Sequence, residues 1–228
     1  MDPITGENLR TEKTFHKLIR KQQKELETMR RKHHKEKNAV QKQQCAAIDK
    51  IVKGNKNDDL ANDPEIRELV VQQMRQWSEL LEKQRKEEWE LLKDHLWQQG
   101  EVLKKLMEQA QAGQMKQLEA KFERENKEMK ARQAKISVET AREVSGDKTL
   151  RNKAERERRL REKNSNNTKK FIEERKTAAL KQGKEREKLK KVHEKQLQDL
   201  SKETGNAVET YKNAEAEYKL AAKLECFI

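Results

Sequence analysis

The chain has 228 residues, of which 42% are charged and 4% aromatic, and its formal net charge is +13. This composition excludes an ordinary globule with a large apolar core, and two cysteines are too few for a disulfide framework. The abundant residues are Ala, Glu, Lys, Gln, Leu and Arg, which favour helices, so we expect long helices instead of disorder.

Two breaks divide the chain into three predicted helices, at about residues 10–53, 64–143 and 148–226, within a single domain covering 1–228. The first break, KGNKNDDLANDPE, ends at Asp63 and Pro64, a good N-cap and first helical residue. The second, VSGDK, places Gly146 after one helical pattern and Asp147 before the next. Both cysteines, Cys45 and Cys226, are expected to be free thiols in a reducing compartment.

Apolar residues recur every eleven residues in all three segments. The second has Leu96, Met107, Leu118 and Met129 at this spacing; the first has Leu18, Met29, Val40 and Ile51, and the third has Ala178, Leu189, Leu200 and Tyr211. Eleven residues over three turns give a nearly straight or gently right-handed apolar seam. With short connections the helices should run antiparallel. The predicted fold class is therefore all-α, an elongated antiparallel bundle or coiled coil of three long helices.

The shorter first helix can cover only part of the hairpin formed by the other two. Apolar side chains of the second helix at the uncovered end then favour self-association, and we expect a homodimer through a candidate interface of Leu118, Phe122, Met129 and Ile136. Trp77, Trp89 and Trp97 are interpreted as core or dimer-interface residues, with a partner groove as the alternative.

Catalytic chemistry is not indicated anywhere in the chain. His33 and His34 point about 100° apart on a helix and cannot chelate one metal as an i, i+4 pair could. His16, His95 and His193 stand among charged residues, where solvated side chains are expected, and there is no glycine-rich phosphate loop. We therefore expect no catalytic residue, no metal site and no cofactor in this segment.

The excess positive charge is local. Residues 10–53 carry a net +9 and residues 148–196 a net +11, whereas residues 64–143 are neutral. Within the second basic segment, lysines spaced three and four apart form a basic stripe: Lys181, Lys184, Lys188, Lys191 and Lys195, with Lys170 one repeat earlier. A charge run is commonly a solvated face, but this density favours an anionic partner surface.

Two anionic surfaces are candidates. A membrane attracts each nearby Lys or Arg by about 1 kcal/mol without any insertion. Nucleic acid also attracts lysines, but the stripe lacks interleaved aromatics and any base-reading motif, so we do not expect nucleic acid as a partner. A membrane-bound rod is the preferred interpretation; the alternatives are a structural or a nucleic-acid-binding basic coiled coil.

The residues GDKTLRNKAERERRLREKNSNNTKKFIEERKTAALKQGKEREKLKKV, 146–192, resemble the C-terminal coiled-coil region of the phospholipase C-beta family. The NKAERERR and NSNNTKKFIEERK blocks carry the resemblance, and the rest of the chain fits the same region in length and character. The catalytic barrel of that family, with its calcium ligands and histidines, has no counterpart here.

The resemblance implies a non-catalytic regulatory module of a calcium-dependent phosphoinositide phospholipase C. It implies peripheral association with the inner face of the plasma membrane, binding of the activated Gq alpha subunit and acceleration of GTP hydrolysis by that subunit. Calcium is expected only in the absent catalytic part.

Overall fold

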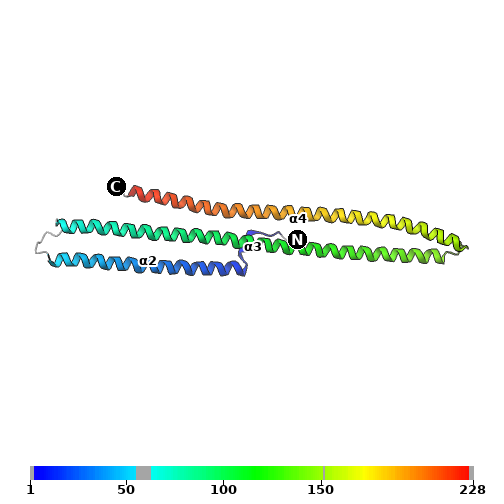
Figure 1. Cartoon of the computed structure of the whole chain (residues 1–228), viewed down its shortest axis with the longest axis horizontal. Coiled ribbons are helices and arrows are strands. Elements are labelled where there is room, and N and C mark those ends of the chain that lie inside the picture. Colours follow the sequence, from blue (N-terminus) through cyan, green and yellow to red (C-terminus); the bar gives the residue numbers. More distant parts are fainter. Residues whose placement is uncertain (1–2, 55–62, 151, 226–228) are drawn as a thin grey trace. The chain divides into compact units, whose positions relative to one another are not determined.

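The computed structural model describes residues 3–54, 63–150 and 152–225, which form four helices and no strand (Figure 1). They are α1 (Gly6–Arg10), α2 (Lys13–Gly54), α3 (Pro64–Gly146) and α4 (Lys153–Glu225). The predicted all-α class and the three long helices are confirmed. The short α1 was not predicted; its N-cap is Thr5, whose hydroxyl accepts a hydrogen bond from the Asn8 amide at 3.3 Å.

Helix starts follow the capping residues. The Asp63 carboxylate accepts a hydrogen bond from the Glu65 amide at 2.8 Å, as predicted for an N-cap before Pro64. The start of the last helix was predicted about five residues too early, because Asp147 instead bonds Thr149 in a turn, at 2.9 Å from the amide. The cap of α4 is Asn152, whose side chain accepts a hydrogen bond from the Ala154 amide at 3.1 Å.

Residue contacts divide the chain into two compact units, which we describe separately. The three-helix unit consists of Thr5–Lys105, that is α1, α2 and the first half of α3, together with α4 from Leu200 onward. The two-helix unit consists mainly of Leu106–Asp199, the second half of α3 and most of α4. The prediction of a single domain stays a prediction.

In the three-helix unit, α3 has partners on two sides. Antiparallel α2 faces it through pairs such as Gln22 with the His95 carbonyl. Antiparallel α4 faces it through the Trp89 and Tyr211 rings, whose centroids are 4.6 Å apart. Gly100 of α3 faces Thr204 of α4, where an added Cβ would be in ordinary van der Waals contact with the Thr204 side chain, at 3.4 Å.

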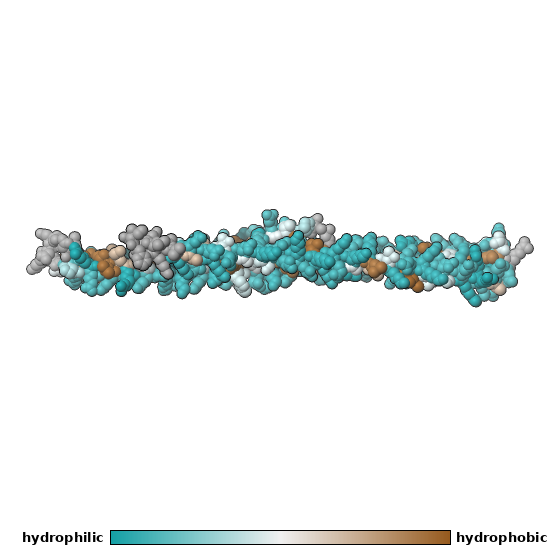
Figure 2. All heavy atoms as spheres, turned by 90° about the horizontal axis from the view of Figure 1, so that it is seen from above, coloured by the Kyte–Doolittle hydropathy of each residue, from teal (hydrophilic) through white to brown (hydrophobic). Residues whose placement is uncertain are grey.

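The eleven-residue seam of the prediction is confirmed as the line of helix contact. Leu103, Met107, Leu118 and Phe122 of α3 and Leu200 of α4 are buried, and the seam residues of α2 are half-buried. The outer surface is polar, and the face drawn in Figure 2 shows only small, separate hydrophobic patches. Helical backbone satisfies its own hydrogen bonds, so such thin packing is compatible with a sequence of which 42% is charged.

Candidate functional site

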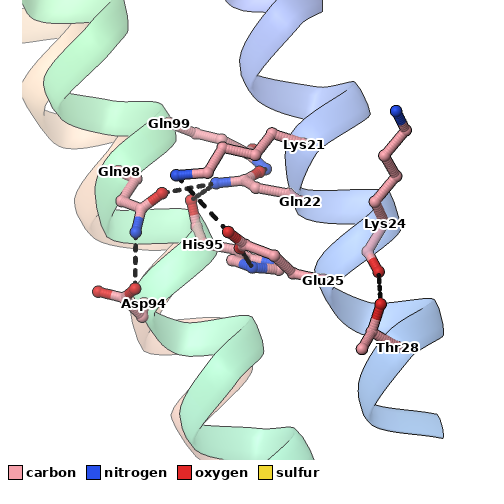
Figure 3. Close-up of polar contacts among 9 residues, drawn as sticks. All are labelled: Lys21, Gln22, Lys24, Glu25, Thr28, Asp94, His95, Gln98 and Gln99. Atoms are coloured by element: carbon pink, nitrogen blue, oxygen red, sulfur yellow. Dashed lines mark hydrogen bonds and ion pairs between the residues drawn. The ribbon is translucent and has the colours of Figure 1, made fainter. Parts of the chain in front are cut away.

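Side-chain amides and imidazoles lie at the centre of the contact between α2 and α3. Gln22 donates from Nε2 to the His95 carbonyl oxygen at 3.0 Å, and His95 Nε2 lies 3.0 Å from Glu25 Oε2 (Figure 3). One repeat further along α2, Gln84 donates to the His33 carbonyl at 3.0 Å, and His33 Nε2 lies 2.9 Å from Glu87. The same arrangement, with the helices exchanged, therefore repeats after eleven residues.

The two-helix unit uses the same arrangement between α3 and α4. Gln111 donates to the His193 carbonyl at 2.9 Å, and His193 Nε2 lies 2.9 Å from Gln114 Oε1. Two repeats along α3, Gln133 donates to the Phe171 carbonyl at 3.4 Å. Halfway between these polar layers lies Phe122, which is 2% exposed.

These layers correct the expectation that His16, His95 and His193 are solvated. His95 and His193 are 4% and 8% exposed, and only His16 of the three is exposed. His33, for which only a metal pair with His34 was considered, is also buried, at 5%. The prediction took charged sequence neighbours as a sign of exposure. On a helix, however, adjacent residues face different directions, so a buried histidine can have charged neighbours in sequence. The available signal was the spacing itself, since Gln22, His33 and Gln44 repeat every eleven residues.

The local electrostatics follow from these contacts. The hydrogen bond from His33, together with Lys32 and Lys83 nearby, lowers the pKa of Glu87 below its ordinary value. Burial lowers the pKa of His193, because the charged imidazolium loses solvation. Tyr211 is raised to a pKa of about 12, first by burial and then by Glu215 and Glu88. Each of these groups lies at a contact between two helices.

The predicted basic stripe lies on α4 in the two-helix unit. All six of its side chains are exposed: Lys170, Lys181, Lys184, Lys188, Lys191 and Lys195. None of the six forms an ion pair or a side-chain hydrogen bond with another residue of the part of the chain that the structure describes. Their ammonium groups therefore have no carboxylate partner within residues 3–54, 63–150 and 152–225.

Unlike the lysines of the stripe, the cationic side chains next to the seam form ion pairs with the facing helix. Arg186 makes two contacts with the Glu119 carboxylate, at 2.5 Å from Nε and 2.7 Å from Nη2, and these hydrogen bonds lower the pKa of Glu119. Lys121 of α3 lies 3.3 Å from Glu185 of α4, so this carboxylate pairs with α3 and not with a lysine of the stripe. Glu185 of α4 is thus engaged by α3, whereas Glu187 pairs with Lys190 of the same helix at 3.5 Å.

A shallow apolar groove adjoins the stripe. Leu180, at its centre, is 69% exposed, the highest value among the exposed large apolar side chains of the described residues. The groove is lined by Lys176, Ala179, Leu180, Gly183, Lys184, Glu187, Lys188 and Lys191. Periodicity did not reveal it, because Leu180 is off the seam.

The candidate dimer residues separate into two groups. Leu118 and Phe122 are 7% and 2% exposed within one chain, because α4 already covers them. Met129 and Ile136 are half-buried and remain available for a further contact. The expectation that α4 leaves these side chains uncovered is thus wrong for Leu118 and Phe122. The homodimer stays a prediction, which now rests on Met129 and Ile136.

The tryptophans also differ from one another. Trp89 packs on Tyr211 within the three-helix unit, in agreement with the core interpretation, and Trp77 is half-buried. Trp97 is 62% exposed, so it is not a core residue.

Among the residues that the structure describes, no group of three His, Cys, Asp or Glu side chains is placed to hold a metal ion. The described helices also include none that is long and apolar enough to cross a membrane.

Comparison with known proteins identifies the family, although no family model matches the sequence. The chain is 46% identical over 226 residues to a 1-phosphatidylinositol 4,5-bisphosphate phosphodiesterase of Drosophila melanogaster. It is 43% identical over 237 residues to the beta-4 phosphodiesterase of Rattus norvegicus. A solved structure of the C-terminal domain of the Drosophila phospholipase NORPA is 45% identical, with 92% of this chain and 98% of that chain covered and a TM-score of 0.60.

The chain belongs to the phospholipase C-beta family. It corresponds to the C-terminal coiled-coil domain, since it covers 98% of the NORPA C-terminal domain at 45% identity. It spans about a fifth of the length of the curated relatives it matches: 21% of the Drosophila protein and 20% of the rat protein. The C-terminal domain of turkey PLC-beta shares the fold, with a TM-score of 0.72 at 20% identity. A further NORPA structure, 40% identical to this chain, is a complex with INAD PDZ45.

Proposed function

We propose that this domain is a non-catalytic regulatory module of a phosphoinositide phospholipase C and that it holds the parent enzyme against anionic membrane at the inner face of the plasma membrane. The observation that carries the membrane part is the basic stripe, whose six exposed lysines have no anionic partner among the described residues. Each lysine near an anionic surface contributes about 1 kcal/mol, so several together give useful attachment without insertion of a helix.

The same module is proposed to bind the activated Gq alpha subunit, to support stimulation of the lipase and to accelerate GTP hydrolysis. The support is membership of the phospholipase C-beta family. A domain attached to both membrane and G protein would raise the effective concentration of the enzyme at its substrate without any catalytic contact of its own.

The membrane proposal is tested by charge reversal at matched net charge. Replacement of Lys181, Lys184, Lys188, Lys191 and Lys195 with glutamate should abolish co-sedimentation with phosphatidylserine vesicles and leave helicity unchanged. A control replaces the same number of exposed α3 lysines: Lys104, Lys116, Lys127, Lys130 and Lys135. If both variants lose binding equally, only the net charge matters and the stripe is not the binding surface.

The rival functions remain a structural coiled coil and a basic coiled coil that binds nucleic acid. Tighter binding to RNA or duplex DNA than to vesicles of matched phosphate content at equal salt would favour the second rival. Binding to neither would leave a structural role, in which the lysines serve solubility.

A further inference from the structure

Leu180 projects from the side of α4 that faces away from α3. The side of α4 that contacts α3 carries Gln182, which is 7% exposed and hydrogen-bonded to Asn126 of α3 at 3.2 Å. Two positions along a helix correspond to a rotation of about 200°, so Leu180 points nearly opposite Gln182. Its 69% exposure agrees with this direction.

The residues around Leu180 leave its side chain standing clear of the helix. Ala179 and Gly183 are small, and a Cβ added at Gly183 would meet nothing within 4 Å. Lys176 and Lys184 lie one turn before and one turn after Leu180 on the same groove. Lysine stems can lie along an apolar surface and keep the ammonium group in water, so these neighbours extend the apolar area around the leucine.

We propose that Leu180 inserts into the interfacial region of an anionic bilayer as an apolar anchor beside the basic stripe. This inference rests on the proposed membrane function and adds a second, non-electrostatic contribution to it. Lys184, Lys188 and Lys191 belong both to the stripe and to the lining of the groove, so the face that meets anionic headgroups also directs Leu180 toward the lipid.

The surroundings favour a bilayer over a protein partner as the occupant. A stable protein interface buries about 800 Å² on each partner and is centred on well-packed, largely uncharged anchors. Here a single leucine stands among four lysines and Glu187. A lipid interface can accept one shallow apolar side chain between ammonium groups, since it needs no fixed complementary shape.

Salt separates the two contributions to binding. At an ionic strength of about 1 M the Debye length is roughly 3 Å, so attraction between exposed charges is strongly screened. Burial of apolar surface is not weakened by this screening. An apolar anchor therefore leaves a residual affinity for vesicles in high salt that depends on the size of residue 180.

The test measures co-sedimentation of the full chain with phosphatidylserine vesicles at low and high salt, for the parent and for variants with unchanged net charge. Leu180→Ala should weaken binding about fivefold at low salt, since it removes part of the apolar area that inserts, and should abolish the residual binding at high salt. Leu180→Phe should strengthen both. Val138→Ala is the matched control, because Val138 is 52% exposed on α3 of the same unit and away from the stripe.

A second measurement reports insertion directly. In a variant with Cys45→Ser and Cys226→Ser, an environment-sensitive dye on Leu180→Cys should shift to the blue with phosphatidylserine vesicles and be quenched by spin-labelled lipid. The same dye on Val138→Cys should not respond. The proposal is overturned if Leu180→Ala binds like the parent at both salt concentrations, or if the dye at position 180 stays in water. The charge-reversal variant of the stripe tests the underlying membrane function separately, so failure of the anchor can be distinguished from failure of that function.

Discussion

Gln84 and His33 lie opposite each other across the contact of α3 with α2, where Gln84 Nε2 donates to the His33 carbonyl oxygen at 3.0 Å. Both side chains are buried, at 4% and 5% exposure. A buried amide N–H needs an acceptor, and Gln84 Nε2 has two, the His33 carbonyl and the Glu36 carboxylate, each at 3.0 Å. A shift of either helix by less than a full eleven-residue repeat would separate Gln84 from the Glu36 carboxylate, so the pair penalises such shifts.

Loss of this pair should therefore destabilise the three-helix unit. Gln84→Ala removes both the hydrogen bond and buried volume, and the free energy of unfolding should fall by about 1–3 kcal/mol. Gln43→Ala on the exposed face of α2 is the control and should change stability by less than about 0.5 kcal/mol. Urea unfolding followed by circular dichroism measures both; equal effects would show that the layer does not contribute to stability.

His193 should make the two-helix unit less stable in mild acid. Burial lowers its pKa in the folded state, so between that value and the ordinary value of about 6.5 the unfolded chain binds more protons. The contribution of His193 is fully present above the unfolded pKa and is lost as pH falls toward the folded pKa. We expect His193→Gln to reduce the drop in melting temperature between about pH 7.5 and 5.5. His34→Gln, at an exposed position, serves as control. If the melting temperature of His193→Gln falls as much as that of the parent, His193 is not the group that causes the loss of stability in acid.

The ring of Tyr211 should contribute to stability, whereas its hydroxyl should not. The ring packs on Trp89, and the buried hydroxyl has no hydrogen-bond partner among the described residues. Tyr211→Phe should thus be neutral or stabilising, whereas Tyr211→Ala should cost about 3–5 kcal/mol, as for a buried aromatic. Thermal unfolding of the two variants gives the comparison. A large cost for Tyr211→Phe would reveal a hydrogen bond to the hydroxyl.

Alkaline titration provides an independent check on the burial of Tyr211. Its pKa is raised to about 12, so this hydroxyl stays neutral in the folded state at pH values where the unfolded chain ionises. The associated stability is present below the ordinary pKa of about 10 and is lost as pH rises toward 12. In a titration followed by phenolate absorbance, the part of the increase that occurs near pH 12 should be absent in Tyr211→Phe.

Phe122 should behave as an interior residue and not as an interface residue. It is 2% exposed within one chain, between the layers of Gln111 and Gln133. Phe122→Ala should lower the free energy of unfolding by about 3–5 kcal/mol. Met129→Ala with Ile136→Ala, at half-buried positions, should instead weaken self-association in sedimentation equilibrium if the predicted homodimer forms through them. A chain that stays monomeric across the micromolar range would contradict the dimer.

The helices and their contact line could be predicted from the sequence because they follow local signals. Asp63 and Pro64 start a helix by backbone chemistry alone, and an apolar period of eleven residues indicates where helices touch. The polar layers could not be predicted by looking for apolar residues, since Gln22 and His33 are at the centre of the contact while apolar seam residues such as Met29 lie beside them. Their burial depends on a partner amide or carboxylate on another helix, which only the register supplies.

The candidate binding surface, the basic stripe, was predictable to a similar extent. The spacing of Lys181, Lys184 and Lys188 is enough to place them on one exposed face. The sequence did not indicate that nearby carboxylates such as Glu185 are engaged by α3, nor that Leu180 stands exposed beside the stripe. Both depend on which side of α4 meets α3, a property of the assembled unit.

Binding of the activated Gq alpha subunit can be tested on this domain alone. The domain should bind the alpha subunit carrying a transition-state mimic of GTP more tightly than the GDP-bound subunit, because only a ligand that distinguishes the two states can respond to activation. Titration by calorimetry or fluorescence anisotropy in both states measures the difference. The Lys181, Lys184, Lys188, Lys191 and Lys195 charge-reversal variant separates this contact from membrane attachment, since a G-protein contact outside the stripe should survive in solution. Equal and negligible binding in both states would remove the G protein from the proposed function and leave the membrane-bound module or the structural coiled coil.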